Sequence, residues 1–435
     1  MKKRILIITV FLALFAIAGN AQIVCHVEGE LMSNKYGYDV VICEMGTDMR
    51  VHNDPSIHVR AVNGKFSKTI ECDHITKYMA FIYGQYRKNG FITFAPFYAE
   101  NGTVRLKLYA DQDHSVQSDG EEGLKKQALD NLLEEKFGDI HALSDLLYDK
   151  EHKSDFYTAD YFNSLDKLRQ EKQEEQNKTY PNQARLDSIY QVMDQLYNNP
   201  DRFTPQGLEL YNKIQKRNKE RDDFKYQYYI DHPMLESLYE SFNAFNELRF
   251  HVDSSNPWPY ERLIDIYHDK LINYFPEHPI HEQIAIIEAG NNLQPGKPYI
   301  DYNVRNNDGQ LVSISSLIKG KVALIDLWAS WCGPCRSHSV AMIPIYEKYK
   351  DKGFTVIAIA RENKKEAMEK AMKQDGFPWP SLLELKDENQ IWEKNGLGKS
   401  GGGMILVDRD GTILSTSPDA KELEPLIRKA LGLGP

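Results

Sequence analysis

The sequence has few cysteines, no excess of positive charge and, after its first residues, no long apolar run. Lysine and arginine number 53 against 63 aspartate and glutamate residues, which gives a formal net charge of −10. Proteins that bind nucleic acid need a concentrated basic surface to neutralise phosphates, so no nucleic-acid partner is expected. After the N-terminus, no apolar run approaches the roughly 20 residues that a membrane-spanning helix needs.

Only five cysteines are present, and they are unevenly spaced. Cys332 and Cys335 form a close pair, whereas Cys25, Cys43 and Cys72 are isolated from one another in the N-terminal region. A zinc site would need a second close pair of cysteine or histidine ligands, so no metal site is predicted. Two of the three N-terminal cysteines could form a structural disulfide in an oxidising compartment, and the sequence does not select which two.

The N-terminus has the layout of a secretory signal peptide. Residues 1–4 carry the positive charge, an apolar run follows over residues 5–18, and small residues lead up to Ala21. We predict cleavage after Ala21 and a periplasmic location for the mature protein. Cys25 raises the question of a lipoprotein, but Val24 is larger than the small residue that a lipobox places before its cysteine. A soluble exported protein is therefore favoured over a lipoprotein.

Three patterns follow one another along the mature chain. The first consists of short apolar or alternating segments separated by turn dipeptides such as Asn63-Gly64 and Asn101-Gly102, which is typical of β structure. The second has apolar residues at helical spacing. The third alternates strand and helix patterns, which implies a layered sheet flanked by helices. The predicted fold class is multidomain, with a signal peptide over 1–21, an all-β sandwich-like domain over 22–119, an α-helical region over 120–290 and an α/β domain over 294–435.

The chemistry is concentrated in one segment of the third region. A run of β-forming and apolar residues over 322–328 leads into Cys332-Gly333-Pro334-Cys335, where a helix is expected to begin. Unpaired backbone N–H groups and the positive end of the helix dipole stabilise a thiolate at such a position and lower the pKa of the leading cysteine. Cys332 is therefore the predicted nucleophile. Cys335 can reach it within one helical turn and is the predicted resolving thiol.

This segment resembles the active site of thioredoxins, and residues 294–431 resemble the TlpA and ResA type of exported bacterial thiol-disulfide oxidoreductase. The resemblance implies a thioredoxin fold in which Trp331 shields the cysteines and Asp326 is the buried acid that exchanges a proton with the resolving thiol. Independently, a carboxylate within an apolar strand should have a raised pKa because of desolvation. The N-terminal β domain resembles the all-β domain of unknown function that often precedes thioredoxin modules in exported bacterial proteins.

One position departs from the family pattern. Counted back from the turn at 408–411, the family's cis-proline position falls on Gly402. A cis bond before a residue other than proline costs about 2.5 to 4 kcal/mol, so we predict a trans bond between Gly401 and Gly402. Because glycine is conformationally free, we expect these two residues to form a loose substrate-binding platform with a gap beside the thiols.

The sequence thus predicts an extracytoplasmic thiol-disulfide oxidoreductase whose only redox group is the Cys332–Cys335 disulfide, with no other cofactor. The Gly-Pro dipeptide resembles that of thioredoxin, whose reduction potential is about −270 mV, whereas a dedicated oxidant has a potential near −120 mV. This difference corresponds to roughly 7 kcal/mol for the transfer of two electrons, and it favours a reductase. The expected partners are a disulfide-containing protein substrate and a membrane thiol-transfer protein that donates electrons. The alternative is a non-enzymatic protein that uses the thiols and the glycine loop to hold a metal or a partner.

Overall fold

The computed structural model describes residues 22–52, 54–90, 93–148, 153–178, 183–248, 261–416 and 420–434. The predicted signal peptide lies outside the described residues. Within the described ranges, no helix combines the length and the apolar character that crossing a membrane requires. The chain divides into two compact units, Met1–Met45 with Ser56–Leu124 and Gly46–Pro55 with Lys125–Pro435.

This division differs in two ways from the one expected from the sequence. The segment Gly46–Pro55 lies inside the expected β region but groups with the second unit. The helical residues from Lys125 onward, expected as part of a region of their own, group with the C-terminal fold rather than apart from it. Hydrophobic periodicity reports local structure, whereas this grouping depends on contacts between residues far apart in the chain.

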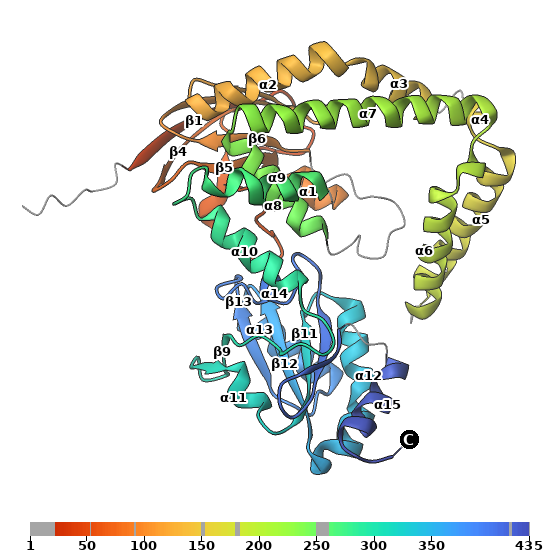
Figure 1. Ribbon diagram of the computed structural model, residues 1–435. Coiled ribbons are helices and arrows are strands. Elements are labelled where there is room, and N and C mark those ends of the chain that lie inside the picture. The colour runs from red at the N-terminus through yellow and green to blue at the C-terminus, as the bar shows by residue number, and fades with distance from the viewer. Residues whose placement is uncertain are drawn as a thin grey trace, which may run out of the picture. The chain divides into compact units, whose positions relative to one another are not determined.

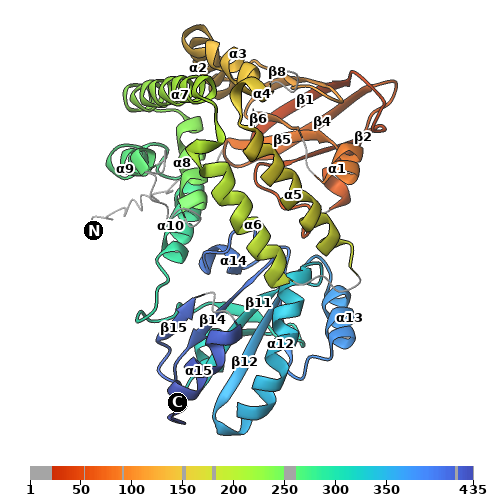
Figure 2. The same ribbon diagram turned by 90° about the vertical axis from the view of Figure 1, so that its right-hand side faces the viewer.

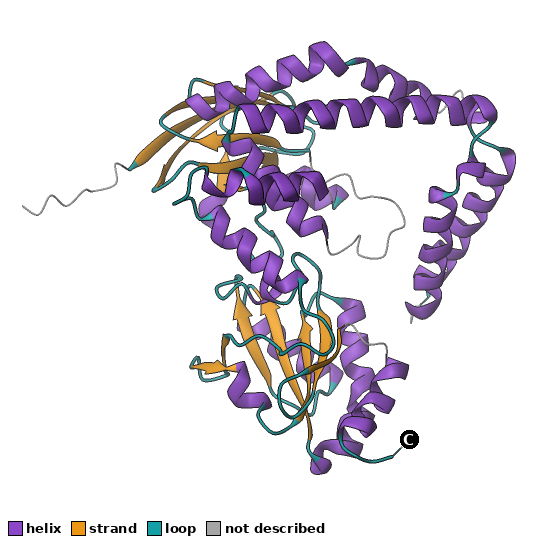
Figure 3. Cartoon of the chain, viewed as in Figure 1, coloured by secondary structure: helices purple, strands orange, loops and turns teal. Residues whose placement is uncertain are grey.

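Two four-stranded sheets make up the first unit, drawn among the orange strands of Figure 3. Their strand orders are β4-β1-β7-β8 and β3-β2-β5-β6. Residues of both sheets share one apolar core, which is the arrangement of a β-sandwich. No disulfide joins Cys25, Cys43 or Cys72. The elements are β1 (Ile23–Leu31), β2 (Asp39–Glu44), β3 (His58–Arg60), β4 (Lys65–Cys72), β5 (Thr76–Ile82), α1 (Tyr83–Asn89), β6 (Ala95–Ala99), β7 (Gly102–Leu108) and β8 (Ser115–Ser118).

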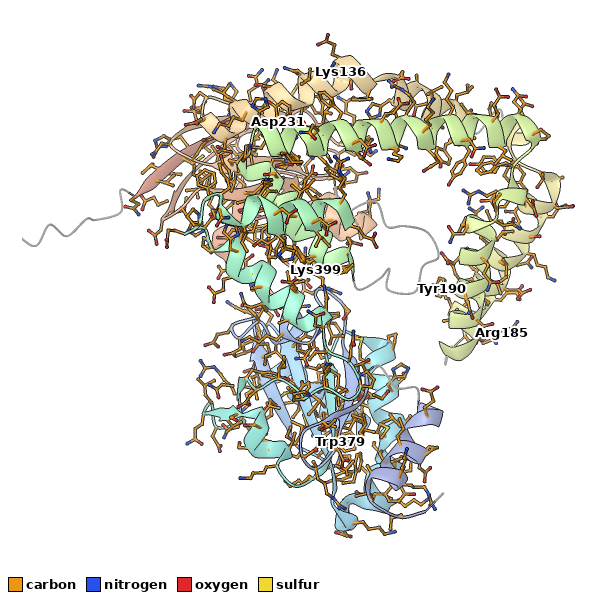
Figure 4. The ribbon with its side chains drawn as sticks, viewed as in Figure 1. Lys136, Arg185, Tyr190, Asp231, Trp379 and Lys399 are labelled. Atoms are coloured by element: carbon orange, nitrogen blue, oxygen red, sulfur yellow. A yellow bond between two sulfur atoms is a disulfide. The ribbon has the colours of Figure 1, made fainter. Side chains whose placement is uncertain are left out.

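Helices follow where the sequence predicts helical spacing. Several begin at residues suited to capping: the hydroxyl of Thr158 accepts a hydrogen bond from the Tyr161 N–H, and that of Thr204 accepts one from the Gly207 N–H. Asp231, labelled in Figure 4, ends the longest of these helices. They are α2 (Glu121–Phe137), α3 (Asp139–Tyr148), α4 (Lys153–Phe156), α5 (Ala159–Gln176), α6 (Gln183–Asn198), α7 (Pro205–Asp231), α8 (Leu235–Leu248), α9 (Glu261–Asp269) and α10 (Ile280–Asn291).

The C-terminal part is a seven-stranded sheet of order β10-β9-β13-β12-β11-β14-β15, with helices on its two faces (Figures 1 and 2). Its central strand β11 pairs in parallel with β12 and antiparallel with β14. The elements are β9 (Asn303–Arg305), β10 (Leu311–Ser313), α11 (Ile314–Ile318), β11 (Val322–Trp328), α12 (Gly333–Tyr349), β12 (Phe354–Glu362), α13 (Lys365–Asp375), β13 (Ser381–Leu385), α14 (Ile391–Lys394), β14 (Gly403–Val407), β15 (Ile413–Thr416) and α15 (Ala420–Ala430).

Strand β11 is buried along its whole length, as the uninterrupted apolar run predicts for a strand covered on both faces. Leu324 and Trp328 pack in one core with residues of α12, α13 and α15. Ala323, Ile325 and Leu327 pack on the opposite face with residues of α11 and α14. Because side chains alternate along a strand, position 326 falls on the face that α12 covers.

Candidate active site

The two cysteines of the motif lie at the start of α12 and are joined by a disulfide. Cys332 is the N-cap residue, and its sulfur accepts a hydrogen bond of 3.3 Å from the Cys335 N–H. Gly333 and Pro334 form the exposed first turn, where a proline is tolerated because its missing N–H would have no partner within the helix. The predicted nucleophile therefore lies at the positive end of a 17-residue helix.

Asp326 is the buried carboxyl that the sequence predicts, with 1% of its surface exposed. Desolvation raises its pKa from an ordinary value of 3.8 to about 7, and a hydrogen bond from Ser339 acts in the opposite direction. The Ser339 hydroxyl lies 2.7 Å from Asp326 Oδ2 and 3.1 Å from the carbonyl oxygen of Cys335. One hydroxyl group thus connects the buried acid with the backbone of the second cysteine.

A second buried carboxyl, which sequence reasoning missed, holds the turn before the cysteines. Glu362 ends β12, and its carboxylate accepts hydrogen bonds from the backbone N–H of Ser330 at 2.5 Å and from the Ser330 hydroxyl at 2.9 Å. Desolvation raises the pKa of Glu362. Because β11 and β12 are parallel neighbours, their carboxyl ends meet at one edge of the sheet. Glu362 could have been identified from the sequence if the pairing of these two strands had been predicted.

Trp331 and its surroundings form one side of the site. Its side chain is half-buried, and Cys332 follows it directly in the chain; its shielding role stays a prediction. The guanidinium of Arg50, which comes from the segment Gly46–Pro55, lies 4.1 Å from the centre of the Trp331 ring. No pattern in the sequence pointed to Arg50, since it precedes the motif by some 280 residues and belongs to no recognisable motif of its own.

The two glycines of the expected substrate platform lie opposite the disulfide, and no cis peptide bond occurs among the described residues. A Cβ added at Gly401 would lie 2.4 Å from the Cys332 sulfur, and one added at Gly402 would lie 1.9 Å from the carbonyl oxygen of Leu327. The expected gap at Gly402 was therefore wrong. Gly402 packs against the backbone of β11, and Gly401 is the residue that faces the sulfurs, because glycine alone permits both close approaches.

This arrangement supports thiol-disulfide exchange. It combines an exchangeable disulfide at a helix N-terminus with a buried acid whose pKa of about 7 lets it take up or release a proton near neutral pH. Within the described part of the chain, no group of three or more histidine, cysteine, aspartate or glutamate side chains is placed to hold a metal ion.

The C-terminal part is similar to known redox proteins. Residues 289–427 match the family model Redoxin. The thiol-disulfide oxidoreductase ResA from Bacillus thuringiensis (strain Al Hakam) is 29% identical over 126 residues, which are 28% of this chain and 68% of that protein. The thioredoxin-like protein YneN from Bacillus subtilis (strain 168) is 31% identical over 101 residues, which are 22% of this chain and 58% of that protein.

Solved structures are also similar to about a third of this chain. The thioredoxin domain of a thiol-disulfide oxidoreductase from Bacteroides vulgatus is 26% identical, with a TM-score of 0.30, and the match covers 32% of this chain and 99% of that one. A thiol:disulfide interchange protein from Bacteroides sp. is 26% identical, with a TM-score of 0.30, over 32% of this chain and 91% of that one. The thioredoxin-like fold expected for the C-terminal region is confirmed.

Proposed function

We propose that the protein reduces disulfides of exported proteins through Cys332 and Cys335, because residues 289–427 match the Redoxin family model and the chain is similar to thiol-disulfide oxidoreductases. The observation that carries the proposal is the disulfide at the N-terminus of α12 with Asp326 buried behind it. The reducing direction follows from the thioredoxin-like Gly-Pro dipeptide between the cysteines.

The reaction has two exchange steps. The Cys332 thiolate attacks one sulfur of a substrate disulfide, so that a mixed disulfide forms and the other substrate sulfur leaves as a thiolate. Cys335 then loses its proton to the Asp326 carboxylate and attacks the Cys332 sulfur. The Cys332–Cys335 disulfide forms, the second substrate thiolate leaves, and two electrons have passed to the substrate. The Ser339 hydroxyl, which lies 2.7 Å from Asp326, orients the acid for this proton transfer.

The proposed location is the periplasm, after cleavage of residues 1–21. Each turnover leaves the enzyme oxidised, and a periplasm is kept oxidising, so the protein needs an electron donor. A membrane protein that passes cytoplasmic reducing equivalents by thiol transfer is the simplest donor. The N-terminal β-sandwich and the helices α2 to α10 are proposed to bind the substrate or the donor.

Trapping in cells tests this function. Cys335→Ser removes the resolving thiol, so mixed disulfides between Cys332 and its substrates should accumulate and can be identified by mass spectrometry after non-reducing electrophoresis. Cys332→Ser is the matched control and should trap no substrate. In parallel, the purified wild-type protein should catalyse reduction of insulin by dithiothreitol. Absence of both trapped proteins and insulin reduction, together with tight metal binding by the reduced protein, would favour the non-enzymatic alternative.

A further inference from the structure

Residues 46–52 form a tight turn in the segment that follows β2 and groups with the second unit. The backbone N–H groups of Val51 and His52 both donate to the carbonyl oxygen of Asp48, at 3.0 and 2.8 Å. The Asp48 carboxylate also accepts a hydrogen bond of 3.0 Å from the backbone N–H of Arg50. Val51 is fully buried. These contacts fix Asp48, Arg50 and His52 as one local unit.

This turn is anchored on buried charges of the C-terminal sheet. Arg361, which is 1% exposed, donates two hydrogen bonds of 2.6 Å to Asp387 and lies 3.4 Å from Asp48 Oδ2. His52 Nε2 lies 3.1 Å from Asp387 Oδ2. A buried guanidinium is stable only with its carboxylate partners in place. Asp48 and His52 therefore attach the turn to the strand ends beside the active site.

The anchored turn places Arg50 between two loops that flank the disulfide. Its guanidinium lies 4.1 Å from the centre of the Trp331 ring, and Trp331 directly precedes Cys332. Its Nη2 donates a hydrogen bond of 2.6 Å to the carbonyl oxygen of Lys399, which is labelled in Figure 4. Lys399 lies two residues before Gly401, the residue that faces the Cys332 sulfur. Arg50 thus joins the motif to the glycine loop, residues 399–403.

The contribution of Arg50 depends on the shape of its guanidinium as well as on its charge. Asp48 already binds its guanidinium with hydrogen bonds of 2.6 to 3.2 Å, so the positive charge is compensated. A guanidinium is flat and offers several N–H donors in one plane, so it can lie over an aromatic ring and bind a carbonyl oxygen at the same time. An ammonium group has no flat face that could lie over the ring while its N–H groups bind the carbonyl oxygen.

We propose that Arg50 is a positioning residue that holds the glycine loop in place for binding a disulfide substrate at Cys332. The loop contains consecutive glycines, of which Gly401 faces the disulfide, and glycine has the conformational freedom to leave its productive position. The contact from Arg50 supplies the order that the loop sequence does not. This inference rests on the proposed function and adds a residue from outside the C-terminal sequence to its substrate site.

Steady-state reduction of insulin by the full-length mature protein, with dithiothreitol as the reductant that regenerates the dithiol, tests the proposal. Arg50→Ala should raise the KM for insulin about tenfold, from the loss of one aromatic contact and one hydrogen bond, with kcat changed less than about twofold. Hydrogen exchange of the amides of residues 399–403 should become faster. Alkylation of Cys332 by iodoacetamide should keep its rate, because a small reagent does not need the loop. Arg50→Lys should resemble Arg50→Ala, since it keeps the charge and loses the planar contact.

Arg217→Ala is the matched control. Arg217 pairs with Asp139 through two hydrogen bonds and lies 5.0 Å from the centre of the Phe137 ring, so the variant loses the same kinds of contact within the helices. It should leave KM unchanged. The inference would be overturned if Arg50→Ala changed neither the KM nor the rate of hydrogen exchange in residues 399–403. Faster turnover of the variant would also overturn it, because the turn would then obstruct the substrate. Failure of the proposed function is distinguishable, because then the wild-type protein itself would not reduce insulin.

Discussion

Replacing Asp326 by asparagine should stabilise the C-terminal fold and at the same time slow its reaction. The pKa of Asp326 rises from 3.8 to about 7 on folding, because burial penalises the carboxylate. The folded state therefore holds the proton more tightly than the unfolded state. The stabilising contribution of the neutral acid is complete below about pH 4 and is lost as the pH rises to about 7. Asparagine has a similar shape, stays neutral and can still accept the hydrogen bond from Ser339.

The magnitude follows from the pKa change. Each pKa unit corresponds to about 1.4 kcal/mol, so Asp326→Asn should raise the free energy of unfolding by about 2 kcal/mol at pH 5 and by about 4 kcal/mol at pH 8. Denaturant titration of the oxidised protein at both pH values, followed by tryptophan fluorescence, measures this difference. Stopped-flow measurement of mixed-disulfide release should show a loss of at least about 10²-fold at pH 8, with formation much less affected.

Glu384 provides a matched control. It is also fully buried in the same sheet, and desolvation raises its pKa to about 7, but no role in the exchange is proposed for it. Glu384→Gln should show a similar pH-dependent stabilisation and leave mixed-disulfide release unchanged. A stability difference between wild type and Asp326→Asn that does not grow with pH would refute the burial argument. Equal slowing of formation and release would remove Asp326 from the resolving step.

Three further outcomes are expected. Ser339→Ala removes the hydrogen bond that lowers the pKa of Asp326, so the pH midpoint of mixed-disulfide release should move upward, as a pH series of stopped-flow rates will show. Gly402→Pro should lower the free energy of unfolding by about 1 to 3 kcal/mol, since an added Cβ would lie 1.9 Å from the Leu327 carbonyl oxygen and the loop must shift; unchanged thermal stability would contradict the close approach. N-terminal sequencing of the exported protein should find Gln22 as the first residue, and a lipid-modified Cys25 would exclude this.

The sequence by itself determined the features whose causes are local. The strand Val322–Trp328 and the helix that starts after Cys332 were predicted from an apolar run followed by a capping position and a proline. The burial and raised pKa of Asp326 followed from its place within that run. Each of these depends on neighbours within about a dozen residues, which is the range over which periodicity and capping act.

Only the tertiary structure decided which distant residues complete the site. Ser339 reaches Asp326 because α12 covers that face of β11, and Glu362 reaches the Ser330 turn because β11 and β12 are parallel neighbours. The direction of the two glycines depends on how closely β14 approaches β11, so the sequence alone could not show which of them faces the sulfurs. Arg50 joins the site through a buried ion pair between residues some 300 positions apart. Such contacts leave no periodic trace in the sequence, because they are fixed by packing and by the need of buried charges for partners.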